Sequence, residues 1–256
     1  MRLQHGPTPQ KIPAMSLPDL GGLVDGLQEL MWPTRCVGCE LPGELLCDQC
    51  RAHLPWIDQQ LACPVCGAPF GQLICTECRR DWPVRSCVCA LPFSGIGARL
   101  VTCLKDGHEL RLAPVVAAAM ATALDEASAW PAPDGAPRFD APSIDAICFV
   151  PATARAYRRR GFDHMELVAR ELSWLLSLPL DDALVREEGL DQRILGRGDR
   201  ELNLRDTIEV ASDVSGMDLL LVDDVITTGA SMRACSAALL DRGATSVTAC
   251  ALARVW

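Results

Sequence analysis

Residues 217–231 read Met-Asp-Leu-Leu-Leu-Val-Asp-Asp-Val-Ile-Thr-Thr-Gly-Ala-Ser, and this stretch decides the predicted fold. Its apolar part suits a strand buried on both faces of a parallel sheet, and Asp223 and Asp224 stand where that strand should end. The small residues from Thr227 to Ser231 then lead into the helical pattern of Met232–Leu240. Such a turn presents free backbone N–H groups and the positive end of a helix dipole, so it predicts a phosphate site.

The acidic pair beside the predicted phosphate site narrows the kind of ligand. Two carboxylates repel a simple polyanion, so the ligand must also carry groups that carboxylates favour. Ribose hydroxyls, which donate hydrogen bonds, and a phosphate-bound Mg²⁺ both meet that requirement. A plain turn with two solvated aspartates would leave Thr227, Thr228 and Gly229 unexplained, so we expect a sugar phosphate with a metal ion.

Length, hydropathy and charge exclude several classes of protein. The 256 residues suffice for one large domain or two smaller ones, and 49% of them are apolar. No apolar run reaches the ~18 residues of a membrane span, and the first residues lack the pattern of a secretory signal. We therefore expect a cytoplasmic protein without a membrane partner. The net charge of −9 argues against nonspecific nucleic-acid binding by the whole molecule, so such binding would need a local basic patch.

Most of the 14 cysteines are concentrated between Cys36 and Cys89, and eight of them form four Cys-x-x-Cys pairs. In a chain without a secretory signal this pattern indicates metal rather than disulfides. Each pair can place two thiolates on one ion, so four pairs predict two closed Cys₄ zinc sites of a structural kind. Sequential pairing of neighbouring pairs is the simpler arrangement, and the spacing leaves an interleaved arrangement open. The predicted ligands are Cys36, Cys39, Cys47, Cys50, Cys63, Cys66, Cys75 and Cys78. The other six cysteines are expected to pack in the core.

The chain divides into four predicted segments. Residues 1–15 are polar, carry prolines and are expected to be disordered, with Met15 as an alternative start. Residues 16–32 show the spacing of an amphipathic helix with acidic charges, which we expect to pack on the protein's own zinc module rather than on a membrane. Residues 33–85 form the double zinc ribbon, and residues 86–256 form the ligand-binding domain.

Strand and helix patterns alternate along that second domain. Such alternation is typical of an α/β protein with a parallel sheet, whose ligand lies at the carboxyl ends of the strands. The expected strands are 86–90, 144–150, 180–185, 219–222 and 246–254, and the expected helices are 110–129, 165–178 and 232–240.

Two further segments of the domain carry arginines. Residues 151–164 follow a predicted strand and contain Arg155, Arg158, Arg159 and Arg160, which indicates a second anion-binding element. The alternative is a solvated basic face. Residues 187–206 are polar and too long for an idle loop, so they are predicted to be a lid or substrate loop.

Val222–Ser231 resembles the signature with which type I phosphoribosyltransferases bind 5-phosphoribosyl 1-diphosphate (PRPP). With the cysteine pairs before it, the chain from Met15 onward resembles the ComF family. Further matching residues are Leu104, Lys105, Gly107, Arg160, Gly161, Phe162, Gln192, Leu195, Arg200 and Asn203. The resemblance implies a type I phosphoribosyltransferase fold, a mostly parallel sheet with flanking helices, preceded by a small double zinc-ribbon module.

The resemblance also implies roles for individual residues. The acidic pair would contact the ribose 2- and 3-hydroxyls, the loop after it would hold the 5-phosphate, and residues 151–160 would bind pyrophosphate with a Mg²⁺ ion. The implied catalytic residues are Asp223, Asp224, Arg158, Arg159 and Arg160. The implied PRPP-binding residues are Asp223, Asp224, Val225, Ile226, Thr227, Thr228, Gly229, Ala230, Ser231, Ala152, Thr153 and Lys105.

Two positions depart from the family patterns. Asp163 and His164 stand where ComF proteins usually have Asn and Gln, which leaves the role of these two side chains open. Thr227 stands where 6-oxopurine phosphoribosyltransferases carry an aspartate that acts on the base, which weakens a hypoxanthine- or guanine-salvage function.

Two functions from different classes remain. The first is an enzyme that transfers the phosphoribosyl group to an unknown acceptor and releases pyrophosphate, with Mg²⁺. The second is a non-catalytic PRPP- or nucleotide-binding protein of the DNA-uptake or competence type, in which the zinc module binds single-stranded DNA or a protein partner. Trp32, Trp56 and Trp82 can stack on bases in that module, although packing is their more common role. The oligomeric state stays undetermined.

Overall fold

The computed structural model describes residues 33–72, 75–76, 78, 81–186 and 208–256. Its centre is a four-stranded parallel sheet in the order β1-β6-β5-β2. The strands are β1 (Ser86–Pro92), β2 (Ala146–Phe149), β5 (Asp218–Ile226) and β6 (Ser246–Arg254). Because the strands are parallel, their carboxyl ends meet at one edge of the sheet, as the ligand prediction requires.

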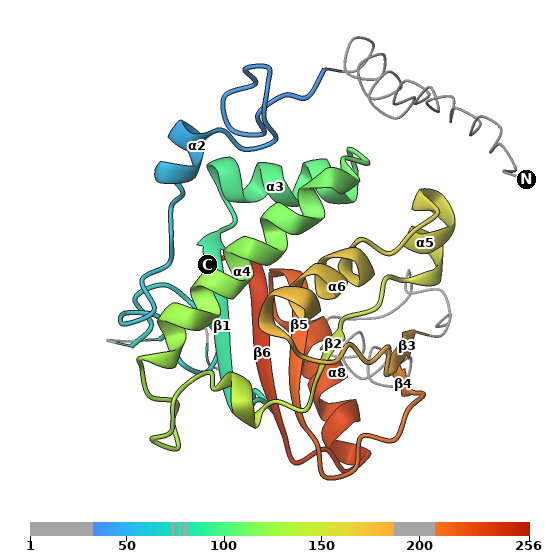
Figure 1. The fold of residues 1–256 in the computed structure, drawn as a ribbon. Coiled ribbons are helices and arrows are strands. Elements are labelled where there is room, and N and C mark those ends of the chain that lie inside the picture. Colours follow the sequence, from blue (N-terminus) through green and yellow to red (C-terminus); the bar gives the residue numbers. More distant parts are fainter. Residues whose placement is uncertain (1–32, 73–74, 77, 79–80, 187–207) are drawn as a thin grey trace, which may run out of the picture.

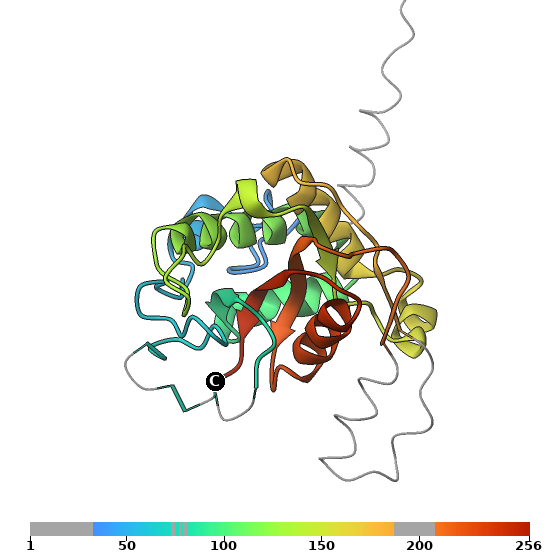
Figure 2. The same ribbon diagram turned by 90° about the horizontal axis from the view of Figure 1, so that it is seen from below.

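Helices cover both faces of the sheet. The helices are α3 (Gly95–Lys105), α4 (Ala113–Ser128), α5 (Ala154–Arg160), α6 (His164–Leu176) and α8 (Ala230–Asp241), with the 3₁₀ turns η1 (Leu110–Leu112) and η2 (Ala141–Ser143). α4 and α6 lie together on one face, and α8 lies on the opposite face (Figures 1 and 2). This arrangement is the flanked parallel sheet that the alternating pattern predicts.

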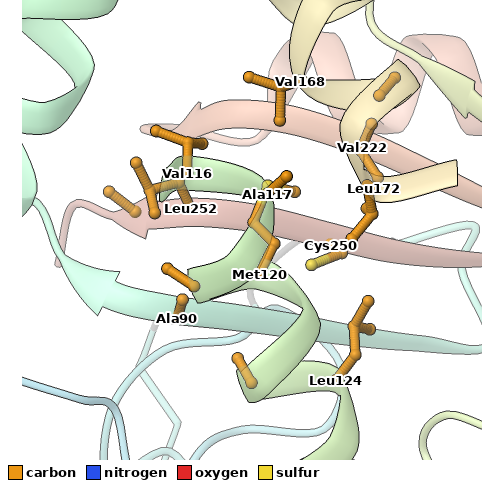
Figure 3. Packing of buried hydrophobic residues seen from close by; sticks show 14 of the residues in the cluster. Ala90, Val116, Ala117, Met120, Leu124, Val168, Leu172, Val222, Cys250 and Leu252 are labelled. Carbon is orange, nitrogen blue, oxygen red and sulfur yellow. The ribbon is translucent and has the colours of Figure 1, made fainter. Parts of the chain in front are cut away.

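The core on the α4 and α6 face is built from aliphatic side chains. Val116, Met120 and Leu124 of α4 lie over β1 and β6, and Val168 and Leu172 of α6 lie toward Val222 of β5, as Figure 3 shows. All of these side chains are buried. A parallel sheet covered on both faces needs near-continuous apolar strands, and Leu219–Val222 is such a run, buried throughout.

The zinc module contributes to the other face of the sheet. Helix α2 (Asp48–Ala52) belongs to the first ribbon, whereas Cys63, Cys66 and Ala68 of the second ribbon share a buried cluster with Cys87 and Cys89 of β1. Side chains alternate across a strand, so these two cysteines of β1 face the ribbon while their neighbours face α4. The expected core packing of Cys87 and Cys89 is confirmed.

Most of the predicted elements are observed, and three differ. β5 continues past the acidic pair to Ile226, because Asp223 and Val225 keep their pairing with β6. Residues 154–160, expected as a loop, form α5, whose first turn is capped by the Thr153 side chain accepting from Ala156 N. The strand expected at residues 180–185 is observed only at residues 184–186.

That strand, β3 (Leu184–Arg186), pairs antiparallel with β4 (Ile208–Val210) in a separate two-stranded sheet. The expectations for residues 1–15, 16–32 and 187–206 concern segments outside the described residues. Among the described helices, none combines the length and the apolar character needed to span a bilayer.

Candidate functional site

The loop between β5 and α8 encloses a cavity of about 60 Å³. It is lined by Asp223, Val225, Ile226, Thr227, Thr228, Gly229, Ala230, Ser231 and Met232, so the predicted phosphate loop lines one small cavity. Gly229 precedes the first residue of α8 and has φ +74°, a left-handed conformation that glycine adopts without strain. The free N–H groups of the first turn of α8 therefore begin at this cavity.

A second cavity of about 330 Å³ shares Asp223, Val225, Thr227 and Ser231 with the first. It extends from β5 to the segment after β2 and to the end of α3. Its other lining residues are Lys105, Val150, Pro151, Ala152, Thr153, Ala156, Arg160, His164, Met165, Arg186 and Asp224. The acidic pair consequently lies between a small loop cavity and a larger cavity that contains cationic side chains.

The two aspartates have different surroundings because β5 runs through them. Successive side chains of a strand point to opposite faces, so Asp223 lies on the α8 side and Asp224 on the α6 side. Asp223 is half-buried and its Oδ1 accepts from Asp224 N at 2.8 Å. Asp224 is buried and its Oδ2 accepts from two side chains that are distant in sequence.

Those two donors are Lys105 and His164. Lys105 Nζ lies 2.6 Å and His164 Nε2 2.7 Å from Asp224 Oδ2. Arg160 Nη1 lies 3.0 Å from His164 Nδ1, and a guanidinium can only donate. Nδ1 is therefore the acceptor, and the imidazole proton sits on Nε2, where it points at Asp224. Arg160 thus fixes the tautomer with which His164 orients the aspartate.

These surroundings move the pKa values of the pair in opposite directions. Desolvation, together with the neighbouring charge of Asp224, raises the pKa of Asp223 well above its usual value. Burial opposes ionisation of Asp224 as well, but the hydrogen bond from His164 and the charge of Lys105 outweigh it and lower the pKa of Asp224. The site thus holds one carboxylate firmly ionised beside one that resists ionisation until a donor or cation arrives.

We expect Asp223→Asn to make the unliganded protein more stable at neutral pH and its stability less dependent on pH. A carboxyl whose pKa is raised by folding stabilises the fold below its unfolded pKa of about 4 and loses that contribution as pH rises through the folded value. Asp224, with the opposite shift, loses its contribution only in acid. Melting temperatures between about pH 5 and pH 8 measure the difference. If the melting temperatures of the wild type and of Asp223→Asn changed equally with pH, the raised pKa of Asp223 would be contradicted.

The arginine-rich segment enters the site only in part. Arg160, nearly buried, lines the larger cavity, but Arg158 and Arg159 are exposed on α5 and line neither of the two cavities described above. Arg159 Nη2 instead donates to Asp106 Oδ1 at 3.0 Å. Ala152 and Thr153 lie in the lining, as does Lys105. The structure therefore brings together the predicted PRPP-binding residues and one of the three predicted catalytic arginines.

Three residues of the site were not assigned by the sequence. Asp163 caps α6 through Met165 N, and its Oδ2 accepts from Ala152 N at 2.7 Å, which ties the segment after β2 to α6. His164 orients Asp224. Arg186 comes from β3 and lines the larger cavity. The only sequence signal was the departure at Asp163 and His164. The contact that gives His164 its role is with Asp224, 60 residues away along the chain.

The eight Cys-x-x-Cys cysteines form two clusters of four, Cys36, Cys39, Cys47 and Cys50 in one and Cys63, Cys66, Cys75 and Cys78 in the other. Within each cluster the sulfurs lie within 4.8 Å of one another, which suits one tetrahedral ion. A Cβ at Gly38 would lie 2.6 Å from Cys50 Sγ, so the first cluster needs a glycine there. The residues fit two zinc ions, and the sequential pairing is confirmed.

Comparisons with known proteins agree with both halves of this structure. The family described as "Double zinc ribbon domain" matches residues 27–79, and "Phosphoribosyl transferase domain" matches residues 158–255. "DNA utilization protein YhgH" of Salmonella typhi is 28% identical over 232 residues, which cover 87% of this chain and 97% of that protein. "Competence protein F" of Haemophilus influenzae is 31% identical over 115 residues, 43% of this chain and 50% of that protein.

The two domain matches and these relatives support a ComF-type family for this chain. A ComF-type chain thus combines a double zinc ribbon with a phosphoribosyltransferase domain, as expected from its cysteine pairs and acidic signature. Among solved structures, a hypoxanthine phosphoribosyltransferase from Staphylococcus aureus aligns with 56% of this chain and 62% of its own, at 12% identity and a TM-score of 0.30. That likeness is too low to support an argument, so the fold assignment rests on the strand order and the family match.

Proposed function

We propose that this ComF-type protein binds PRPP and transfers its phosphoribosyl group to an acceptor, with release of pyrophosphate. The observation that carries the proposal is the position of Asp223 and Asp224 between two cavities. A ribose held by the acidic pair would extend its 5-phosphate toward the loop cavity and its pyrophosphate toward the larger one. PRPP has a phosphate at each end of one ribose, which matches this order of sites.

Each part of the ligand would meet suitable groups. N–H groups of the 227–231 loop and of the first turn of α8 would bind the 5-phosphate. The carboxylates would accept from the two ribose hydroxyls, and Lys105 and Arg160 would lie at the pyrophosphate end. Mg²⁺ would neutralise pyrophosphate charge, and Asp223, a half-buried carboxylate in the lining of both cavities, would be a fitting ligand for it.

In the proposed reaction the acceptor attacks the anomeric carbon as pyrophosphate leaves, so one C–O bond breaks and one bond to the acceptor forms. The protein's residues act by position and charge. The fixed acidic pair holds the ribose, which lowers the entropic cost of aligning the acceptor. Lys105 and Arg160 stabilise the charge that develops on the leaving pyrophosphate.

One observation favours a second function, PRPP or nucleotide binding without turnover. Of the three arginines on the last turn of α5, only Arg160 reaches the cavity, and its guanidinium is engaged with His164. Pyrophosphate would therefore leave with less stabilisation than three arginines would give. In this alternative the ligand sets the state of a DNA-uptake or competence protein, in keeping with the names of its relatives. Single-stranded DNA or a protein would then bind the zinc module.

Release of pyrophosphate from PRPP by the purified protein, offered Mg²⁺ and a panel of nucleobases and amines, separates the two functions. We expect release that depends on both protein and acceptor. A variant with Arg160→Ala should lower the rate at least ~10-fold, because it removes a charge-assisted contact of about 1.5 kcal/mol or more. Arg158→Ala, on the exposed face of α5, is the matched control. PRPP binding without release for every acceptor would favour the binding protein.

The proposal also includes a domain boundary, a location in the cell and a candidate DNA contact of the zinc ribbon. We infer that the zinc ribbon and the ligand-binding domain meet near residues 85 and 86. We also infer that the protein acts in the cytoplasm. In the described part of the ribbon Trp56 is exposed and Trp82 is buried, so a stacking contact with single-stranded DNA would involve Trp56. To check that contact, an oligonucleotide is titrated into the full-length wild type and into Trp56→Ala, and binding to the two proteins is compared by fluorescence.

A further inference from the structure

The second zinc ribbon touches the phosphate loop through one buried arginine. Arg254, the last residue of β6, is 1% exposed. Its Nε donates to Cys66 O at 3.0 Å, and its Nη1 lies 3.1 Å from Ile226 O and 2.7 Å from Thr227 O. Parallel pairing places Arg254 opposite Ile226 at the end of β5. One guanidinium therefore joins a zinc-ligand residue to the end of β5 and to the first residue of the 227–231 loop.

A second contact from the same side involves Trp82, which follows the last cysteine of the ribbon. Its indole packs so closely on Gly229 that a Cβ there would collide with the ring. The guanidinium of Arg233 lies 5.3 Å from the Trp82 ring centroid, and Arg233 Nη1 donates to Thr228 O at 2.8 Å. The ribbon thus supports the far end of the loop as well.

These contacts fix the direction of three successive peptide groups. The carbonyls of Ile226, Thr227 and Thr228 all accept from a guanidinium. In a planar trans peptide the N–H points opposite to the carbonyl of the preceding residue. The N–H groups of residues 227, 228 and 229 are therefore turned away from the two guanidinium groups. Phosphate binding by backbone N–H groups requires such a preset orientation.

The first ribbon makes contacts of another kind. Arg99 of α3 donates to Gly38 O at 2.8 Å, and Arg111 Nη1 donates to Thr34 Oγ1 at 2.8 Å. These bonds hold the first ribbon on α3 and η1, and their donors and acceptors lie outside the lining of the phosphate cavity. The two zinc sites of this chain consequently differ in what they support, and each provides a control for the other.

We propose that Arg254 is a positioning residue for phosphate binding, and that the second Cys₄ site, unlike the first, sets the affinity of the 227–231 loop for a sugar phosphate. The proposal rests on the assignment of this loop as the 5-phosphate site. The closed second ribbon holds Cys66 O in place. Cys66 O fixes Arg254, and Arg254 with Trp82 holds the loop open for the phosphate. Loss of metal at the second site releases this support.

Arg254→Lys tests the link in a chain that keeps both ribbons. A lysine ammonium cannot reproduce the planar fork that reaches the carbonyls of Cys66, Ile226 and Thr227 together. We expect two zinc ions per chain, affinity for ribose 5-phosphate at least ~10-fold weaker by calorimetry, and affinity for Mg²⁺-pyrophosphate within twofold of wild type. Arg242→Lys, exposed at the far end of α8, is the matched control. Ribose 5-phosphate affinity equal to wild type overturns the role of Arg254, and equal loss for both ligands shows general damage instead.

Removal of each zinc site tests the second half of the proposal. Cys75→Ser with Cys78→Ser opens the second site, and Cys47→Ser with Cys50→Ser opens the first. Zinc analysis should give one ion for each protein. We expect the second-site variant to lose ribose 5-phosphate affinity at least ~10-fold and the first-site variant to stay within about twofold. Equal losses would refute the zinc half of the proposal. If either variant fails to fold, Arg254→Lys still decides the role of Arg254.

The two proposals fail in different ways. Wild-type protein that binds neither PRPP nor ribose 5-phosphate refutes the proposed function. Wild-type protein that binds both, with unchanged affinity in Arg254→Lys and in the second-site variant, refutes only the link between zinc and phosphate.

Discussion

Replacing both acidic residues, Asp223→Asn with Asp224→Asn, is expected to abolish the stabilisation of the protein by PRPP. Each carboxylate would lose a charge-assisted hydrogen bond to a ribose hydroxyl, worth about 1.5 kcal/mol or more, so affinity should fall at least ~100-fold. The double variant also leaves Lys105 without the carboxylate to which it donates at 2.6 Å. Melting temperature with and without PRPP and Mg²⁺, and calorimetric titration, measure the effect.

The control for this variant removes two carboxylates elsewhere. Asp125→Asn with Asp241→Asn changes the net charge by the same amount at exposed positions of α4 and α8. This protein should keep the full PRPP-dependent shift in melting temperature, since neither residue lines either cavity. Undiminished stabilisation of Asp223→Asn/Asp224→Asn by PRPP would show that the site lies elsewhere in the molecule.

Removal of zinc is expected to cause the largest loss of stability. Structural zinc sites contribute about 10 kcal/mol or more in isolated modules, and the second ribbon also buries Cys87 and Cys89 of β1. A net loss of about 4 kcal/mol would lower the melting temperature of a chain this size by about 10 °C. Chelation followed by thermal denaturation measures the loss, and the native protein should contain two zinc ions by metal analysis.

Two comparisons isolate the metal from other effects of chelation. Cys103→Ser changes a cysteine outside both clusters and should retain two zinc ions with an unchanged response to the chelator. Added zinc should restore the melting temperature of the chelated protein. Well under two zinc ions in the purified native protein, or an unchanged melting temperature after chelation, would contradict two fully loaded sites.

Two patterns, each read from a continuous stretch of sequence, were predicted correctly in type and order. Four cysteine pairs predicted two clusters of four, and the run 217–231 predicted strand, loop and helix in that order. Such signals depend on spacing and turn chemistry, which a sequence displays directly. The strand was expected to end at Asp223 and Asp224, where the apolar run stops. In the structure β5 continues to Ile226, because pairing with β6 decides where the strand ends.

The segment 151–164 shows where this reasoning fails. Its arginines predicted an anion-binding loop, yet they lie on a short helix that turns Arg158 and Arg159 toward solvent. Helical periodicity separates neighbouring side chains by about 100°, so adjacent arginines cannot all face one cavity. The composition of the segment predicted its positive charge. Only its helical backbone decides toward which side each arginine side chain points.

By itself the sequence determined the two cysteine clusters, the alternating fold, the acidic signature and, through them, the resemblance to the ComF family. Only the tertiary structure decided which side chains meet at Asp224, since Lys105 lies 119 residues away from it and His164 lies 60 residues away. The same holds for Arg254, whose bond to Cys66 spans 188 residues. Local patterns encode period and turns, whereas contacts across a sheet depend on strand order and register, which no single segment specifies.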